Sequence, residues 1–228
     1  EYESSIPQRL GLGGSSAIIT AALRALCEYY HLEIPLPIQA NLALEAETRE
    51  LGMPAGLQDR VAQAYQGLVY MDFSRDLLES RGYGEYERLD PALARNLYVA
   101  YRTSLSEGTE VFHGDIRERW NRGEPAVLDA MKAWADYARE GRECLLRGDF
   151  RRLNELIDAN FDLRARLYPI GPGNREMIDI ARRCGASANF AGSGGAIVGV
   201  YRDPAMLARL TESMQVSGVA VIRPRIAV

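Results

Sequence analysis

Two carboxylates lie on either side of a break in a helical pattern. Glu47 is near the end of a predicted helix, and Asp59 follows twelve residues later, after a stretch with two glycines and a proline. A pair of carboxylates brought together by such a break can bind Mg²⁺ with one side chain and accept a proton from a hydroxyl with the other. Phosphoryl transfer needs little more than these groups and a place for the phosphates. The alternative is two solvated helix residues, which is the commoner situation of a carboxylate.

A glycine-rich segment further upstream is suited to hold phosphates. Gly11, Gly13 and Gly14 precede Ser15, Ser16 and an Ala- and Leu-rich helical pattern. These glycines are expected to adopt conformations closed to other residues, and Ser15 or Ser16 to cap the helix, whose first N–H groups bind anions. No Lys precedes the hydroxyls, as Walker A requires, and Ser16 stands where the dinucleotide motif has its third Gly. A plain glycine turn that caps a buried helix is the alternative.

Helical and strand periodicities predict the elements that position these residues. Helices are predicted at 16–30, 38–50, 60–66, 109–122, 125–147, 149–167, 173–184 and 204–215, strands at 68–73, 97–102, 187–191, 196–201 and 220–227, the end of a strand at 1–7, and a hairpin or irregular loop at 74–90. In the helix at 38–50, Leu42, Leu44 and Ala46 are expected to pack inward, while Glu47 lies on another face. The final strand, turn, strand, helix and strand indicate an α+β layer with helices on one face.

Length, composition and charge are those of an ordinary globular protein. With 228 residues, 47% of them hydrophobic, the chain can bury a core in one large domain or two small ones. A net charge of −4 without a block of like charges argues against a nucleic-acid partner, and no apolar run is long enough to span a membrane. Cys27, Cys144 and Cys184 lack metal-ligand spacing, so we expect buried thiols in a reducing, cytoplasmic environment.

Three segments together resemble the signature motifs of the GHMP kinases, the superfamily of galactokinase and of homoserine, mevalonate and phosphomevalonate kinases. The segment Pro7-x-x-x-Gly11-Leu12-x-x-Ser15-Ser16-Ala17 resembles their phosphate-binding motif. Residues 46–59 are similar to the segment that carries a metal-binding Glu and a catalytic Asp in galactokinases. Residues 185–196 resemble the glycine turn that braces the active site from the C-terminal domain. Three motifs in the family's order, spread over most of the chain, make the match specific.

The resemblance implies a role for each matching residue. The phosphates of ATP would be bound by Pro7, Gly11, Leu12, Gly13, Gly14, Ser15, Ser16 and Ala17, and the site would be closed by Gly192, Ser193, Gly194 and Gly195. Ser16 and Glu47 would bind Mg²⁺, and Asp59 would orient and deprotonate the substrate hydroxyl.

The resemblance also implies an α+β, two-domain GHMP kinase fold. The N-terminal domain, residues 1–95, would be ribosomal protein S5 domain 2-like and would carry the phosphate loop and the catalytic Asp. The C-terminal domain, residues 96–228, would be ferredoxin-like. The family's first signature, which supplies a cationic residue beside that Asp, comes from strands that would precede Glu1. We therefore expect a truncated, cleaved or separately supplied N-terminal segment.

Further segments narrow the resemblance to the glucuronokinases. Two glycines, at 13 and 14, separate Leu12 from Ser15-Ser16-Ala17, where most of the superfamily has a single residue. The other segments are residues 56–63, 67–74, 117–120 and 160–164. Glucuronokinases phosphorylate the anomeric hydroxyl of D-glucuronate with ATP, which implies a sugar or uronate substrate here. The alternatives are another GHMP sugar kinase, acting on galactose, fucose or a heptose phosphate, or a non-catalytic sugar and ATP sensor. Retention of Ser16, Glu47 and Asp59 argues against the sensor, which needs no base.

Three arginines are candidates for binding the carboxylate of a uronate. Arg60, Arg117 and Arg119 are proposed because Arg binds carboxylates through two parallel hydrogen bonds. Ordinary surface arginines are the alternative.

The remaining candidate ligands have simpler interpretations. His31 and His113 are isolated from other metal-binding side chains, so solvated or hydrogen-bonded histidines are expected. Trp120 and Trp134 lie at helical spacing and are expected in the core rather than stacked on a sugar.

Overall fold

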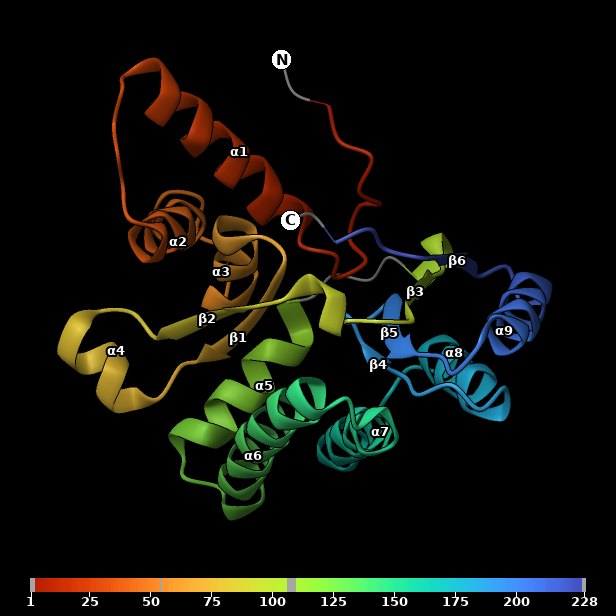
Figure 1. The fold of residues 1–228 in the computed structure, drawn as a ribbon. Coiled ribbons are helices and arrows are strands. Elements are labelled where there is room, and N and C mark those ends of the chain that lie inside the picture. Colours follow the sequence, from red (N-terminus) through yellow and green to blue (C-terminus); the bar gives the residue numbers. More distant parts are fainter. Residues whose placement is uncertain (1–2, 54, 106–109, 227–228) are drawn as a thin grey trace. The chain divides into compact units, whose positions relative to one another are not determined.

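The computed structural model describes residues 3–53, 55–105 and 110–226. Contacts divide the chain into two units, one that contains Gly13–Ala92 and one that contains Pro7–Leu12 and Leu93–Arg225 (Figure 1). The chain therefore passes from one unit to the other inside the glycine-rich segment, between Leu12 and Gly13.

The unit that contains Gly13–Ala92 is built from helices and one antiparallel strand pair. Its elements are α1 (Gly14–Tyr29), α2 (Leu36–Glu45), a π-helix η1 (Ala46–Glu50), α3 (Leu57–Tyr65), β1 (Leu68–Asp72), α4 (Arg75–Arg81) and β2 (Glu85–Leu89). Tyr70 pairs with Glu87 in the register of β1 and β2, and α4 lies in the connection between these strands (Figure 1). Ala40, Val61 and Ala64 form the buried centre, against which the strand pair packs.

The unit that contains Leu93–Arg225 has a four-stranded antiparallel sheet. Its strands are β3 (Leu97–Tyr101), β4 (Asn189–Phe190), β5 (Ala196–Val200) and β6 (Ala220–Ile222), in the spatial order β4-β5-β3-β6. Its helices are α5 (Glu110–Asn121), α6 (Pro125–Arg147), α7 (Phe150–Leu167), α8 (Pro172–Arg183) and α9 (Pro204–Val216), with a 3₁₀ turn η3 (Thr103–Leu105). A further 3₁₀ turn, η2 (Pro91–Leu93), spans the division between the units. Helices lie between β3 and β4 and between β5 and β6, which is the β-α-β-β-α-β order of the ferredoxin-like fold. The expected ferredoxin-like fold is confirmed.

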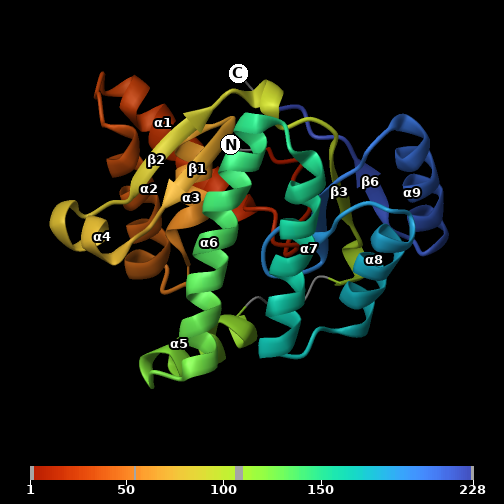
Figure 2. The ribbon, with the colours of Figure 1, turned by 60° about the horizontal axis from the view of Figure 1, so that its bottom comes forward.

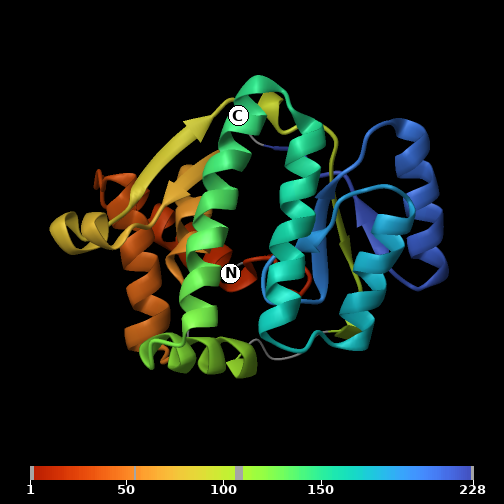
Figure 3. The ribbon, with the colours of Figure 1, turned by 90° about the horizontal axis from the view of Figure 1, so that it is seen from below.

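Helices α7, α8 and α9 of this unit contact its sheet and bury one continuous core with it. Helices α6 and α7 run side by side, joined by a short turn at Gly148, and α8 and α9 follow next to the strands (Figures 2 and 3). Tyr98 and Ala100 alternate on β3 and are fully buried with Phe161 of α7 and Leu210 of α9. Within the described residues, no helix is both long and apolar enough to cross a membrane.

Some local predictions are wrong. No strand is assigned within the described residues 3–7, and the predicted helix at 38–50 divides into α2 and the π-helix η1. Leu42 is 38% exposed, whereas Glu47 is fully buried, the reverse of the expected faces. Ala40, Ala43 and Glu47 are the buried residues of α2 and η1, and their spacing of three and four residues places them on one helix face. Trp120 is 46% exposed and so lies outside the core.

Candidate active site

The helix that follows the glycine segment starts at a glycine rather than at a serine cap. Gly13 is the N-cap of α1, with a left-handed φ of 68°, and no side chain caps the helix. Ser16 is fully buried and its hydroxyl donates to the Gly13 carbonyl at 2.8 Å, so the expected serine cap is wrong. Gly14 is helical, so the special conformation expected of it is found only at Gly13 and at Gly11, whose φ is 64°.

This start leaves a positively polarised helix end. The first helical hydrogen bond runs from the Ala17 amide to the Gly13 carbonyl, at 3.0 Å. The amides of Gly14, Ser15 and Ser16 precede that bond, as the first amides of any helix do. Such amides, together with the helix dipole, can bind an anion such as a phosphate.

Asp59 lies next to the same glycine. A Cβ atom built on Gly13 would be 3.3 Å from the Ser16 hydroxyl oxygen and 4.0 Å from the Asp59 Cβ. Asp59 is in the first turn of α3, and its side chain is 53% exposed. The structure therefore brings together a buried hydroxyl and an accessible carboxylate that are 43 residues apart in the sequence. The accessibility of Asp59 suits a group that must reach a substrate.

Glu47 is held in the interior by one arginine. Its side chain is fully buried in η1, and its Oε2 is bound by the Nε and Nη2 of Arg60. The Nη1 of Arg60 donates to the Gly56 carbonyl at 2.9 Å and lies 3.4 Å from the Asp59 Oδ2. A single guanidinium on α3 thus connects the two carboxylates singled out in the sequence. Glu47 points inward because it continues the buried helix face of Ala40 and Ala43, three and four residues apart.

One oxygen of Glu47 is available to a divalent cation. The second carboxylate oxygen of Glu47, Oε1, is buried and has no hydrogen-bond partner among the described residues. A buried oxygen without a partner costs free energy unless a ligand satisfies it. The described residues contain no cluster of three or more His, Cys, Asp or Glu suited to a metal. One carboxylate and one hydroxyl are instead the donors expected where phosphates and waters complete the coordination of Mg²⁺.

The glycine turn at 192–195 lies against the first part of the glycine segment, within the unit that contains Leu93–Arg225. A Cβ on Gly192 would be 2.4 Å from the Gly11 carbonyl oxygen, and a Cβ on Gly11 would be 2.7 Å from the Ser193 nitrogen. Gly195 has a φ of 77°, and a Cβ there would be 2.6 Å from the side chain of Leu10. Only residues without a side chain allow these two backbones to lie so close together.

Three hydrogen bonds fix the ends of this turn. Arg164 of α7 donates from Nη1 to the Gly192 carbonyl at 2.9 Å. The Asn174 side chain accepts from the Gly195 amide at 2.8 Å, and the Gly195 carbonyl accepts from the Arg102 amide at 3.0 Å. The sequence singled out none of these partners for the turn, because they lie on elements 18 to 90 residues away from it.

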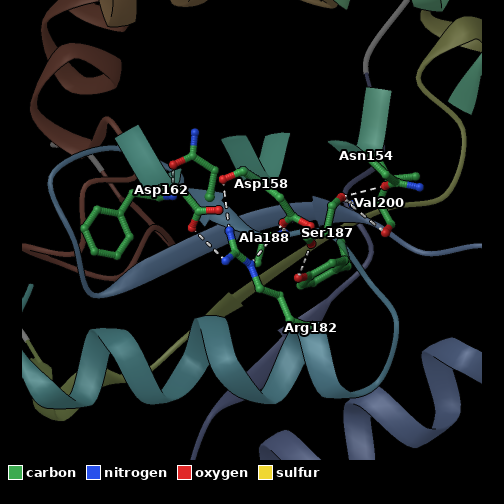
Figure 4. Close-up of polar contacts among 10 residues, drawn as sticks. Asn154, Asp158, Asp162, Arg182, Ser187, Ala188 and Val200 are labelled. Atoms are coloured by element: carbon green, nitrogen blue, oxygen red, sulfur yellow. Dashed lines mark hydrogen bonds and ion pairs between the residues drawn. The ribbon is translucent and has the colours of Figure 1, made fainter. Parts of the chain in front are cut away.

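A polar network holds the strand that leads into the turn. Figure 4 shows Arg182 of α8 between Asp158 and Asp162 of α7, with nitrogen–oxygen distances of 3.2 and 2.8 Å. Asp158 also accepts from the Ala188 amide, and the Ser187 hydroxyl donates to Asn154 at 2.6 Å (Figure 4). Burial raises the pKa of Asp158, although the Ala188 amide and Arg182 oppose that rise. The network anchors the start of β4 to both helices.

The arginines proposed for a uronate carboxylate have other partners. Arg60 binds Glu47, and Arg119 binds both carboxylate oxygens of Glu124 and the Leu167 carbonyl. The guanidinium groups of Arg60 and Arg119 are therefore already bound to carboxylates of the protein, which argues against a role for them in binding a uronate. Arg117 is exposed on α5 and stays a prediction.

The structure describes only some of the other side chains considered in the sequence. Trp134 is half-buried and donates to the Asn160 carbonyl at 3.3 Å, between α6 and α7. The side chain of His113 lies outside the described residues. His31 follows α1 with a φ of 54°. The structure therefore gives Trp134 a packing role.

Comparison with known proteins identifies the family. The model of the GHMP kinases N terminal domain matches residues 1–67, and that of the GHMP kinases C terminal matches residues 142–218. Glucuronokinase 1 of Arabidopsis thaliana is 43% identical over 202 residues, which are 86% of this chain and 55% of that protein. D-glycero-alpha-D-manno-heptose 7-phosphate kinase of Campylobacter jejuni is 30% identical over 159 residues, 68% of this chain and 45% of that protein. The chain spans 55% and 62% of the length of two Arabidopsis thaliana relatives.

Solved structures share the fold. Streptococcus pneumoniae phosphomevalonate kinase, in complex with phosphomevalonate and AMPPNP, matches with a TM-score of 0.77 and 17% identity, over 96% of this chain and 69% of that one. The L. major mevalonate kinase in complex with R-mevalonate matches with a TM-score of 0.70 and 21% identity, over 94% of this chain and 67% of that one. Two family domains in the family's order, a ferredoxin-like unit and 43% identity to a glucuronokinase lead to one conclusion: the chain belongs to the GHMP kinases.

Proposed function

We propose that the protein is a sugar 1-kinase that transfers the γ-phosphoryl group of ATP to the anomeric hydroxyl of D-glucuronate, giving glucuronate 1-phosphate and ADP. The observation that carries the phosphotransferase chemistry is the arrangement around Gly13, where buried Ser16 and accessible Asp59 meet, and Arg60 connects Asp59 to the buried Glu47. The choice of substrate rests on the 43% identity to a glucuronokinase.

The residues of the glycine segment would bind the phosphates of ATP. The amides of Gly14, Ser15 and Ser16 belong to the start of α1, which follows the left-handed Gly13 and has no side-chain cap. Backbone donors of this kind hold negative charge in place and need no rearrangement as the phosphoryl group is transferred. The turn at 192–195, with Gly11 against it, would form the second glycine surface of the nucleotide site.

The carboxylates would divide two tasks between them. Asp59 would accept the proton of the sugar hydroxyl, and its exposed position allows a substrate to reach it. Glu47, through Oε1, and Ser16, through its hydroxyl, would hold Mg²⁺, which neutralises phosphate charge when it is bound. Positioning and charge neutralisation are the main sources of rate enhancement in phosphoryl transfer.

The domain boundary and the cellular location are also proposals. We place the boundary between the two kinase domains at residues 95 and 96, close to the division of contacts after Ala92. A cytoplasmic location is consistent with the three free thiols, Cys27, Cys144 and Cys184, since reducing compartments keep cysteines unpaired.

A heptose phosphate is the second candidate substrate, because a Campylobacter jejuni heptose 7-phosphate kinase is 30% identical over 159 residues. Coupled ADP release from the purified full-length protein, with a panel of glucuronate, galactose, fucose and heptose phosphate, separates the candidates. We expect kcat/KM to be highest for glucuronate. A higher kcat/KM for a heptose phosphate would replace glucuronate, and tight sugar binding without ADP release would make the protein a sensor.

A further inference from the structure

The buried guanidinium of Arg60 contacts two carboxylates, those of Glu47 and Asp59. Its side chain is 6% exposed, and it binds the fully buried Glu47 through Nε and Nη2, both on Oε2. The remaining nitrogen, Nη1, donates to the Gly56 carbonyl and lies 3.4 Å from Asp59. All three nitrogens of the guanidinium are therefore committed, each in a fixed direction.

Arg60 binds only one of the two carboxylate oxygens of Glu47. Both bonds from Arg60 go to Oε2, whereas Oε1 is buried and has no hydrogen-bond partner among the described residues. An Arg fork that binds both oxygens side by side would satisfy the whole carboxylate. A buried ion pair is weak evidence for stability, because desolvation can exceed the Coulombic gain. The one-sided geometry instead suits a carboxylate that keeps one oxygen for another ligand.

We propose that Arg60 is a positioning residue for a divalent cation: it fixes Glu47 through Oε2 so that Oε1 faces the metal. The inference rests on the proposed function, because it takes Glu47 as the metal ligand. The Nη1 of the same guanidinium lies 3.4 Å from the Asp59 Oδ2. Hydrogen-bond partners of this kind orient metal ligands, and their removal typically weakens metal affinity by about 10–100-fold.

A simpler role for Arg60 makes the opposite prediction. If Arg60 only neutralised Glu47, it would compete with the cation, and loss of its positive charge would strengthen metal binding by removing a repulsion. If Arg60 orients Glu47, substitutions that keep the charge and substitutions that remove it both weaken metal binding. Arg60→Lys keeps the charge but loses the planar fork, whereas Arg60→Gln removes the charge as well.

Mn²⁺ is the probe for this difference. Its dissociation constant would be measured by water-proton relaxation on the purified full-length protein saturated with AMP-PNP, after circular dichroism and melting curves have verified that each variant is folded. Arg24→Lys is the matched control, because Arg24 donates to the carbonyls of Gln63 and Ala64 on α3 and has no ion pair with a carboxylate of the described residues. We expect the dissociation constant to rise about 10–100-fold in Arg60→Lys and Arg60→Gln, and to stay unchanged in Arg24→Lys.

The Glu47→Gln variant separates failure of the inference from failure of the proposed function. If Glu47→Gln weakens Mn²⁺ binding but Arg60→Lys does not, or if Arg60→Gln strengthens it, Arg60 is not a positioning residue, although Glu47 remains a metal ligand. If Glu47→Gln leaves Mn²⁺ binding unchanged, the metal assignment itself is wrong. A wild-type protein that binds Mn²⁺ through Glu47 and Arg60 but phosphorylates no sugar would retain the inference and overturn the kinase proposal.

Discussion

Gly192 is the position where one added methyl group tests the contact between the glycine turn and the glycine segment. In Gly192→Ala, the new Cβ would lie 2.4 Å from the Gly11 carbonyl oxygen and 3.1 Å from its carbonyl carbon and Cα. These are backbone atoms, so no rotamer change can relieve the overlap. One of the two backbones must move, and the hydrogen bond from Arg164 to the Gly192 carbonyl moves with it.

The size of the effect follows from this geometry. Forcing an extra carbon into a packed site costs about 1–3 kcal/mol, and a weakened hydrogen bond adds up to about 1 kcal/mol. Taking about 2 kcal/mol as the central value, the melting temperature of Gly192→Ala should fall by roughly 4–8 °C. Because the turn is proposed to contact the nucleotide, KM for ATP should rise as well.

Differential scanning fluorimetry and ADP-release kinetics measure both quantities. Gly141→Ala is the matched control, since Gly141 is inside α6 and a Cβ there would meet only Leu153, at an ordinary 3.8 Å. Replacing a glycine inside a helix by alanine stabilises by about 0.5–1 kcal/mol, so Gly141→Ala should melt slightly above the wild type. If Gly192→Ala melted as high as Gly141→Ala, with an unchanged KM for ATP, the Gly11–Gly192 contact would be refuted.

Three further predictions concern the unit that contains Leu93–Arg225. Phe161→Ala should lower the free energy of unfolding by about 3–5 kcal/mol, because Phe161 is fully buried. Urea titration would then show a lower unfolding midpoint than in the wild type. An unchanged midpoint would place Phe161 outside the core. Tyr98→Phe should lower the free energy of unfolding by about 1 kcal/mol, because it removes the 2.8 Å hydrogen bond to the Ser187 carbonyl. The same urea titration measures this change, and an unchanged free energy of unfolding would contradict that bond. Asp203 caps α9, and its bond from the Met206 amide, followed by that from Arg202, lowers its pKa below the usual 3.8. A carboxylate whose pKa is lower in the folded than in the unfolded protein stabilises the fold at pH values above its unfolded-state pKa, and this stabilisation is lost as the pH falls through the folded-state pKa. The melting temperature of the wild type should therefore exceed that of Asp203→Asn by a smaller margin below about pH 4. A margin that stays constant with pH would contradict this prediction.

The sequence predicts elements best where glycine and proline mark their ends. The helix at 125–147 is found as predicted, between Pro125 and Gly148, and the glycine turn lies between strands as expected. The ferredoxin-like order was available only through the family resemblance, because strand periodicity says which residues form strands and not which strands are neighbours. Short strands such as β4 extend over fewer residues than their patterns indicate, since pairing in the sheet decides where they end.

The residues proposed from the sequence lie in an arrangement that the sequence did not predict. The sequence singled out Glu47, Asp59 and Ser16, yet it placed Glu47 on an outer face and proposed Arg60 for the substrate. The small side chains of Ala40 and Ala43 face the core and Glu47 lies four residues after Ala43, whereas the larger Leu42 and Leu44 suggested another face. The pair of Glu47 and Arg60 joins two elements 13 residues apart, and such pairing depends on how α3 packs. Arg60, between Asp59 and the apolar Val61, was the available signal, because a guanidinium that becomes buried needs a carboxylate partner.

Asp59 provides the most direct test of the proposed chemistry. The kcat for glucuronate with ATP should fall about 10²–10⁴-fold in Asp59→Asn, because a positioned general base contributes that much. Asp76→Asn, an exposed carboxylate in the first turn of α4, should keep the wild-type kcat. ³¹P and ¹³C NMR of the wild-type product should show phosphate on the anomeric carbon. Equal kcat in the wild type and Asp59→Asn, or phosphate on any other hydroxyl, would contradict the proposed sugar 1-kinase.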